Sequence, residues 1–298
     1  MQYAPIEADN RPSGPIIDAG QAWHLILCAR DPSQTRLTLP DSDQPALVLN
    51  DTAEWLQVLP ADDPGQQLLD LFLPLCRPGQ RQVVGQLGQS LDGRIATVTG
   101  ASHFINGEDG LTHLHRLRAI SDAVLVGAGT ACADNPRLTV RLTTGPNPVR
   151  VVIDPQRRVP DSHHLFTDEQ APTLRLVAGD QSVDLNRLPG HRVTEIPCLP
   201  PTGDNPEPIR IVQLLAQMGL RRLFVEGGGF TVSSFLDAGL LDRLHVMVAP
   251  MIIGSGRPAF TLPEIQSLTG ALRPRAQMLN LGSDMLFDLD MTTDCLPA

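Results

Sequence analysis

The sequence contains no lysine, because all 23 of its basic residues are arginine. This absence excludes Schiff-base chemistry, which requires a lysine amine. Arginine is also outnumbered by 33 acidic residues, so the formal net charge is −10. A balance this acidic argues against a general binder of nucleic acid or of anionic membranes. It still allows a local arginine pocket for a small anion.

Paired cysteine motifs are missing as well. The five cysteines are scattered and have no spacing typical of a metal site or a disulfide framework. Neither an H-x-E nor a P-C-x-x-C motif occurs, and zinc deaminases need both for their chemistry. The pattern predicts a protein of the reducing cytoplasm with no bound metal, and it excludes deamination.

Long apolar runs are the third absence. No stretch approaches the roughly 20 apolar residues of a transmembrane helix, and the first 14 residues lack the basic and apolar parts of a signal peptide. We therefore expect no membrane contact. The chain does have 298 residues with 42% hydrophobic content, which is enough for one large domain or two ordinary ones.

A Pro-Gly pair at residues 78–79 marks the expected domain boundary. We assign residues 1–80 to a small αβ segment of unknown role and residues 81–298 to the main domain. No cluster of chemically active side chains stands out in the first segment, so we predict that it is not catalytic. His24 is expected to be a core histidine on an apolar strand. The elements expected in this segment are strands at 22–30 and 45–50 and helices at 51–59 and 63–75.

Strand and helix signals alternate after the boundary. Near-continuous apolar runs are typical of the buried strands of a parallel sheet. The alternation predicts an α/β fold with a mostly parallel central sheet and helices on both faces. The expected strands are 81–90, 122–129, 149–154, 173–179, a late strand from 243 and a closing strand at 285–291, with helices at 109–121 and 208–220.

The stretch "LFVEGGGFTVSSFL" at residues 223–236 combines a short apolar strand, Glu226, three glycines and the start of an amphipathic helix. Glycines allow positive φ and the close approach of a ligand to the backbone. A helix N-terminus presents bare N–H groups to an anion. The stretch therefore predicts a phosphate-binding turn, and a tight turn that binds nothing is the alternative.

Further polar clusters follow other expected strands. Because the carboxyl ends of parallel strands meet at one edge of an open α/β sheet, these clusters are expected to line one crevice that binds a ligand. They comprise Ser90, Asp92, Gly93, the segment "GASHFIN", Arg118, Thr130, Asp134, Asn135, Pro136, Arg141 and Glu226.

In their order and spacing these clusters resemble a known family. The motifs are "SLDGRIA", "GASHFI", "LRAISDAVLVGAGT", "ADNPRLTVR", "VVID", "FVEGG" and "LLDRLHVMVAPMIIGSG". Residues 82–290 thus resemble the reductase domain of riboflavin biosynthesis, which has the dihydrofolate-reductase-like fold. The resemblance implies a homodimer that uses NADPH to reduce a ribosylaminopyrimidine 5′-phosphate to its ribitylamino form. Bacterial members usually carry an upstream deaminase domain, whose motifs are absent here.

The resemblance also implies roles for individual residues. Glu226, Asp134 or an ordered water is expected to assist proton movement. The substrate-binding positions are Ser102, Arg118, Leu138, Arg141 and Glu226. The cofactor-binding positions are Phe104, Thr130, Asp134, Gly228, Gly229, Phe230, Thr231, Val232, Ser233 and Ser234.

Two departures from the family pattern leave the substrate open. Asn135 follows Asp134 where the family often has paired acids, and Phe104 stands where an indole is common. A reductase of a pterin, a folate or another heterocycle is the second reading, and a nucleotide-binding protein without turnover is the third. Arg157 and Arg158 follow the strand at 149–154, where they would either meet a cofactor 2′-phosphate or lie on the surface.

Overall fold

The computed structural model describes residues 15–102, 105–179, 193–200 and 207–292. Contacts within the chain divide it into two compact units, residues 1–79 and 80–298. The larger unit contains all the polar clusters that the sequence singles out.

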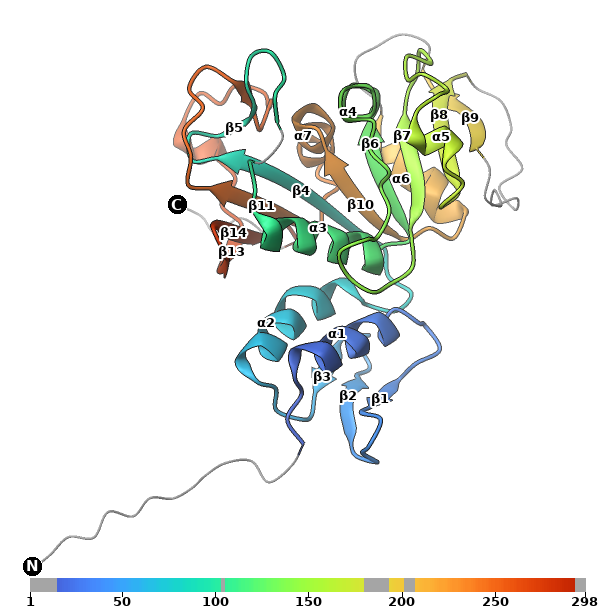
Figure 1. Cartoon of the computed structure of the whole chain (residues 1–298), viewed down its shortest axis with the longest axis vertical. Coiled ribbons are helices and arrows are strands. Elements are labelled where there is room, and N and C mark those ends of the chain that lie inside the picture. The colour runs from blue at the N-terminus through green and yellow to red at the C-terminus, as the bar shows by residue number, and fades with distance from the viewer. Residues whose placement is uncertain (1–14, 103–104, 180–192, 201–206, 293–298) are drawn as a thin grey trace, which may run out of the picture. The chain divides into compact units, whose positions relative to one another are not determined.

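The first unit packs two helices with a small antiparallel sheet (Figure 1). Trp23 meets Phe72 edge-on, with ring centroids 5.5 Å apart, and joins the two helices. The elements are α1 (Ala19–Cys28), β1 (Arg36–Thr38), β2 (Pro45–Leu49), β3 (Trp55–Gln57), α2 (Asp63–Phe72) and the short 3-10 helix η1 (Leu73–Leu75).

Two expectations for this unit are wrong. Residues 22–30 belong mostly to helix α1 and do not form a strand. The helix begins at a capping box in which the side chains of Asp18 and Gln21 bond to each other's backbone N–H. As a result His24 is exposed on a helix instead of lying on a core strand. The expected helix at 51–59 is a turn followed by strand β3, which pairs with β2.

The second unit is built on a nine-stranded sheet with the order β13-β14-β11-β4-β10-β6-β7-β8-β9. Strands β11 through β9 in this order are parallel, and β14 and β13 extend the sheet antiparallel at one edge. The bounds are β4 (Gln82–Ser90), β6 (Ala123–Gly127), β7 (Val149–Ile153), β8 (Thr173–Ala178), β9 (Val193–Leu199), β10 (Arg222–Gly227), β11 (Arg243–Ala249), β13 (Arg275–Leu281) and β14 (Asp284–Asp290). The expected mostly parallel sheet is confirmed, whereas β9 and β13 were not anticipated.

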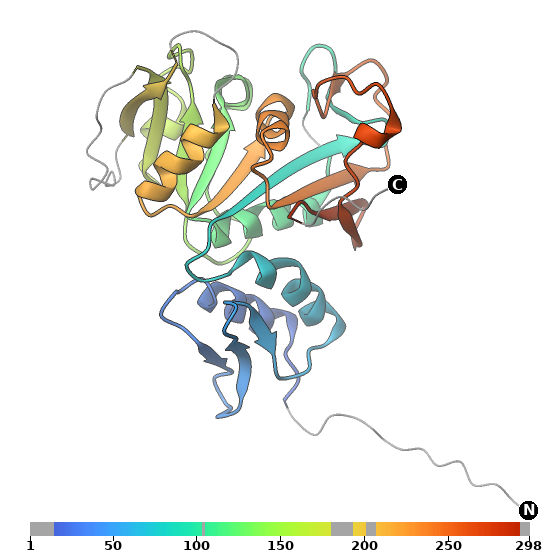
Figure 2. The same ribbon diagram turned by 180° about the vertical axis from the view of Figure 1, so that it is seen from behind.

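Helices cover both faces of this sheet (Figures 1 and 2). Helix α3 lies on one face, and α6 and α7 lie on the other, where their apolar side chains join the main core. Shorter elements complete the unit. The bounds are α3 (Glu108–Ile120), α4 (Ala128–Asp134), α5 (His164–Thr167), α6 (Pro208–Gln217), α7 (Gly229–Asp237), the 3-10 helix η2 (Leu268–Gly270) and the two-stranded pair β5 (Arg94–Ala96) and β12 (Arg257–Pro258).

Among the helices of the described residues, none is both long enough and apolar enough to cross a bilayer.

Candidate active-site cleft

A cleft of about 1100 Å³ opens in the second unit at the carboxyl ends of four neighbouring parallel strands. Strands β4, β10, β6 and β7 each contribute residues to its lining. In open α/β sheets ligands bind outside the carboxyl ends of the strands. The crevice expected from the sequence is therefore present, and its volume suits a nucleotide together with a second small molecule.

Each of the three glycines that join β10 to α7 has its own backbone conformation or contacts. Gly227 has φ of +132°, which other residues avoid, and no atom lies within 4 Å of the place a Cβ would take. The Gly228 N–H donates to Thr130 Oγ1 at 2.7 Å, and the peptide bond between Gly227 and Gly228 is cis. A Cβ on Gly229 would lie only 2.5 Å from the Ala259 carbonyl oxygen. The turn is thus open at Gly227 and closely packed at Gly229.

The first turn of α7 continues the lining through the exposed Phe230 and through Thr231. The next residues do not line the cleft. Val232 is part of the core, and Ser233 Oγ accepts a hydrogen bond from the Thr261 N–H at 2.9 Å. Ser234 Oγ donates to the Phe230 carbonyl oxygen. The part of this helix that can meet a ligand is its N-terminal turn, where backbone N–H groups favour an anion.

Arg118 on α3 and Glu226 at the end of β10 form a paired group in the wall of the cleft. The guanidinium Nε and Nη2 donate to the two carboxylate oxygens at 2.7 and 2.5 Å. Arg118 Nη1 donates to the Thr139 carbonyl oxygen at 2.9 Å. Both side chains are largely buried. Each charge compensates the other, because burying either charge without its partner would cost free energy of folding. Arg118 therefore orients Glu226, in addition to any contact it makes with a substrate.

His115 links this pair to Arg141. The Nδ1 atom of His115 accepts the Arg141 backbone N–H at 2.8 Å, so the neutral ring carries its proton on Nε2. Burial, together with the charges of Arg118 and Arg141, lowers the pKa of His115 to about 3. The imidazole is thus a neutral spacer between two arginines near neutral pH. The Arg141 side chain lines the cleft, and its Nη1 donates to Thr139 Oγ1.

The cleft brings together only part of the side chains that the sequence pointed to. The expectation is wrong for five residues that do not line it: Ser90, Asp92, Gly93, Asn135 and Pro136. Ser102, Thr130 and Asp134 line it with the Arg118–Glu226 pair and Arg141. Leu138 does not line the cleft, because its side chain is buried in the protein. Its backbone has a positive φ of +53°. Phe104 lies outside the described residues.

Other lining residues escaped the sequence reasoning. Arg257 is one of them, because it stands in the short strand β12 with no motif signal, whereas Asn106 belongs to the segment "GASHFIN" that the sequence pointed to. Of the two arginines after β7, Arg158 lines the cleft, whereas Arg157 pairs with Glu195 at 3.1 Å and does not. Arg158 and Arg257 supply positive charge to the cleft. No cluster of three or more metal-binding side chains occurs in the described part of the chain.

The fold and this cleft define an α/β protein with a candidate ligand site at the carboxyl ends of its parallel strands. Residues 81–287 match the RibD C-terminal domain, and the chain belongs to that family. The matched region contains every strand that lines the cleft.

Individual relatives agree with this assignment. A 2,5-diamino-6-ribosylamino-4(3H)-pyrimidinone 5′-phosphate reductase of Methanothermobacter thermautotrophicus is 37% identical over 217 residues, which cover 69% of this chain and 96% of that protein. The riboflavin biosynthesis protein RibD of Aquifex aeolicus is 36% identical over 200 residues, covering 66% of this chain and 54% of that protein. The chain thus spans nearly all of the archaeal reductase but about half of RibD.

A solved structure is similar over a larger share of the chain. It is a diaminohydroxyphosphoribosylaminopyrimidine deaminase/5-amino-6-(5-phosphoribosylamino)uracil reductase of Thermotoga maritima, with a TM-score of 0.56 and 26% sequence identity. The likeness covers 78% of this chain and 64% of that chain. It confirms the fold that the sequence motifs implied.

Proposed function

We propose that this protein is an NADPH-dependent reductase that converts a ribosylaminopyrimidine 5′-phosphate into its ribitylamino form in riboflavin biosynthesis. The observation that carries the proposal is the cleft, in which a glycine turn and an arginine–glutamate pair meet at the ends of β10 and β6. Similarity to the archaeal pyrimidinone 5′-phosphate reductase along nearly its whole length supports the substrate class.

The cleft has the features that NADPH requires. The turn at Gly227 leaves the backbone open to a pyrophosphate, and the first-turn N–H groups of α7 favour its charge. Arg158 lies in the lining beyond β7, where its guanidinium is suited to a 2′-phosphate. We therefore assign the cofactor side of the cleft to the turn, Thr130, Phe230 and Arg158.

Remaining charges suit the substrate. Ser102, Arg141 and the Arg118–Glu226 pair lie together in the lining and would hold a phosphorylated sugar and its ring. When bound, NADPH supplies the hydride that reduces the opened sugar. The protein then has to position the two ligands and move a proton. Both oxygens of Glu226 accept hydrogen bonds from Arg118, so we assign Glu226 to binding and the proton to exposed Asp134 or a water beside it.

We also propose that the protein is a cytoplasmic homodimer. Among the described residues, strand β13 is an edge strand of the nine-stranded sheet, and edge strands pair readily with another strand. Large apolar side chains are exposed on it and before it, including Met278 at 69% and Leu268 at 75%. A second copy would cover them. Light scattering should give twice the chain mass for the wild type and the chain mass for Met278→Lys, and a monomeric wild type would contradict the dimer. None of the four cysteines in the described part of the chain forms a disulfide, which fits a reducing compartment.

The reaction is tested by following NADPH oxidation with the ribosylaminopyrimidinone phosphate and with dihydrofolate in parallel. We expect turnover with the first and none with the second. Turnover of dihydrofolate alone would replace the proposed substrate, and tight NADPH binding without turnover of either would indicate a binding protein.

The Arg158→Glu variant tests the cofactor assignment. It should weaken NADPH binding much more than NADH binding in calorimetry, because only NADPH carries the 2′-phosphate. The Arg157→Glu variant is the matched control, since Arg157 lies outside the lining and pairs with Glu195. Equal losses for both cofactors would place the 2′-phosphate elsewhere.

A further inference from the structure

The turn between β4 and β5 carries Ser90, Asp92 and Gly93 of the "SLDGRIA" motif, and none of these three residues lines the cleft. Asp92 instead binds a loop that lies 161 positions further along the chain. Its Oδ1 accepts the Ile253 N–H at 3.1 Å, and its Oδ2 accepts the Gly254 N–H at 2.7 Å. A carboxylate that accepts two backbone N–H groups of a distant loop holds that loop in place.

The carboxylate of Asp92 is itself oriented by its neighbours in the turn. Ser90 Oγ donates to Asp92 Oδ1 at 2.6 Å and accepts the Arg94 N–H at 3.0 Å. The hydrogen bond from Ser90, together with those from the Ile253 and Gly254 N–H groups, lowers the pKa of Asp92 to about 2. Asp92 is therefore ionised throughout the neutral pH range, and its hydrogen bonds to the loop are charge-assisted.

The loop that Asp92 holds is part of the segment 251–261, which forms one wall of the cleft. Arg257 and Thr261 of this segment line the cleft. The far end of the segment is fixed to α7, because the Thr261 N–H donates to Ser233 Oγ at 2.9 Å. Ser233 is buried and, like Asp92, lies outside the cleft. The segment thus has a side-chain acceptor near each of its ends.

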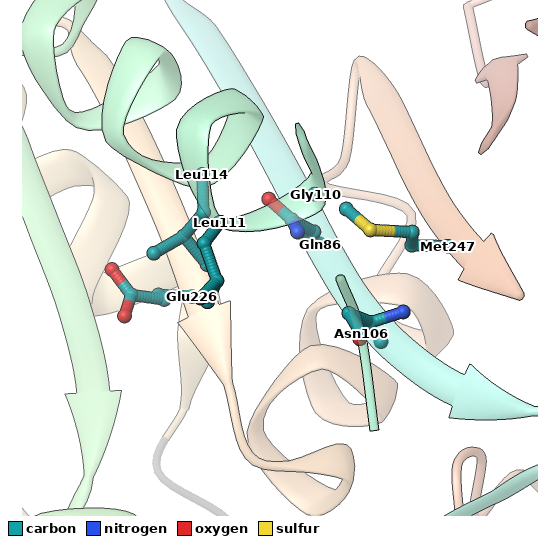
Figure 3. Close-up of a pocket in the computed structure, with 8 residues that line it drawn as sticks. Gln86, Asn106, Gly110, Leu111, Leu114, Glu226 and Met247 are labelled. Atoms are coloured by element: carbon teal, nitrogen blue, oxygen red, sulfur yellow. The ribbon is translucent and has the colours of Figure 1, made fainter. Parts of the chain in front are cut away.

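Another part of the lining is fixed by regular elements and close packing. Leu114 comes from α3 and Glu226 from the end of β10 (Figure 3). Asn106, which precedes α3, packs against β4, where a Cβ on Gly88 would lie 1.8 Å from its Oδ1. By contrast, the segment 251–261 contains only the two strand residues of β12. Its position therefore depends on side chains that lie outside the cleft.

We propose that Asp92 and Ser233 are positioning residues that hold the segment 251–261 as a wall of the cofactor site. Between the two side chains, the Ala259 carbonyl lies so close to Gly229 that a Cβ there would be 2.5 Å from its oxygen. The segment therefore packs directly against the glycine turn, and a loosened segment would loosen the turn. This inference rests on the proposed function, because it takes the turn to be the NADPH site.

Replacing Asp92 tests the effect on the cofactor. Asp92→Ala removes both acceptors, and the dissociation constant of NADPH in calorimetry should rise about tenfold, as for a segment that is in place about one tenth of the time. Asp92→Asn keeps one carbonyl oxygen and should give a smaller rise. Under turnover the loss should appear in KM for NADPH, with kcat near the wild-type value. Asp31→Ala is the matched control and should bind NADPH like the wild type, because exposed Asp31 also accepts an N–H and a hydroxyl, both from Ser33, in the first unit.

Hydrogen exchange tests whether the two ends of the segment depend on each other. In Asp92→Ala, the Thr261 N–H should exchange about tenfold faster although its own acceptor, Ser233, is unchanged. Ser233→Ala should in the same way accelerate exchange of the Gly254 N–H, which is bonded to Asp92. Saturating NADPH should slow both again. A purely local role of either side chain would change only the amides that it binds.

The outcomes separate the inference from the proposed function. A wild type that does not bind NADPH overturns the proposed function and, with it, the cofactor wall. A wild type that binds NADPH beside a folded Asp92→Ala variant of equal affinity overturns the positioning role alone. Unchanged exchange of the Thr261 N–H in that variant would overturn it as well, and so would an equal loss of affinity in Asp31→Ala.

Discussion

Replacing Arg118 by methionine removes one half of a buried ion pair and leaves the Glu226 carboxylate without its bidentate partner. Arg118 donates to both oxygens of that carboxylate, and its remaining terminal nitrogen is hydrogen-bonded to the Thr139 carbonyl. Removing one partner of such a pair costs about 3–5 kcal/mol in the free energy of unfolding. For a unit of about 200 residues this corresponds to a fall of roughly 6–20 °C in melting temperature.

The measurement has to follow the second unit. Both tryptophans, Trp23 and Trp55, lie in the first unit, so intrinsic fluorescence would miss the change. Calorimetry or circular dichroism reports the nine-stranded sheet directly. Glu226→Gln is the partner variant, and the double variant Arg118→Met/Glu226→Gln completes a thermodynamic cycle. The sum of the single losses should exceed the double loss by more than about 1 kcal/mol.

Arg118→Met should also lower kcat/KM for the phosphorylated substrate while NADPH affinity changes little, because we assign the pair to the substrate side of the cleft. The reasoning is refuted if Arg118→Met costs less than about 1 kcal/mol, as an exposed pair would. Additive single losses would equally show that the two side chains do not depend on each other.

Three further predictions concern other parts of the chain. Gly228→Val should weaken NADPH binding strongly in a folded protein, because a Cβ there would lie 2.9 Å from Thr130 Oγ1; unchanged affinity in calorimetry would refute the turn as a cofactor site. The wild type should lose stability as the pH falls from about 6.5 toward 3, because the pKa of His115 is lowered to about 3 and only the unfolded state takes up its proton in that window. His115→Gln should reduce this slope in urea unfolding, and an identical slope would contradict it. A chain beginning at Gly79 should keep NADPH affinity if it is soluble, and a folded truncation that no longer binds would assign the first unit to the site.

Much of the second unit was readable from the sequence because its strands are nearly continuous apolar runs and its polar clusters follow them. The first unit was harder to predict. The run at 22–30 is too short and too apolar for its period to separate helix from strand, and the capping residues Asp18 and Gln21 that decide for a helix precede it. At 51–59, Asp51 and Thr52 suggested a helix cap but form a turn before β3.

The sequence predicted lining residues of the cleft that belong to a motif. It did not predict residues whose place in the cleft depends only on contacts in the folded structure. Arg257 lies in the short strand β12, outside every motif, and its place in the cleft depends on the pairing of β12 with β5. The Arg118–Glu226 pair was hidden in the same way, because 108 positions separate the two residues along the chain.

The contact between Gly88 and Asn106 has a consequence for how this protein can change. Since a methyl group at position 88 would collide with the Asn106 amide at 1.8 Å, the two positions do not vary independently. In a library that randomises both, alanine or serine at 88 should survive selection only beside a smaller residue at 106. Any change of both positions therefore has a required order of steps, in which residue 106 changes first.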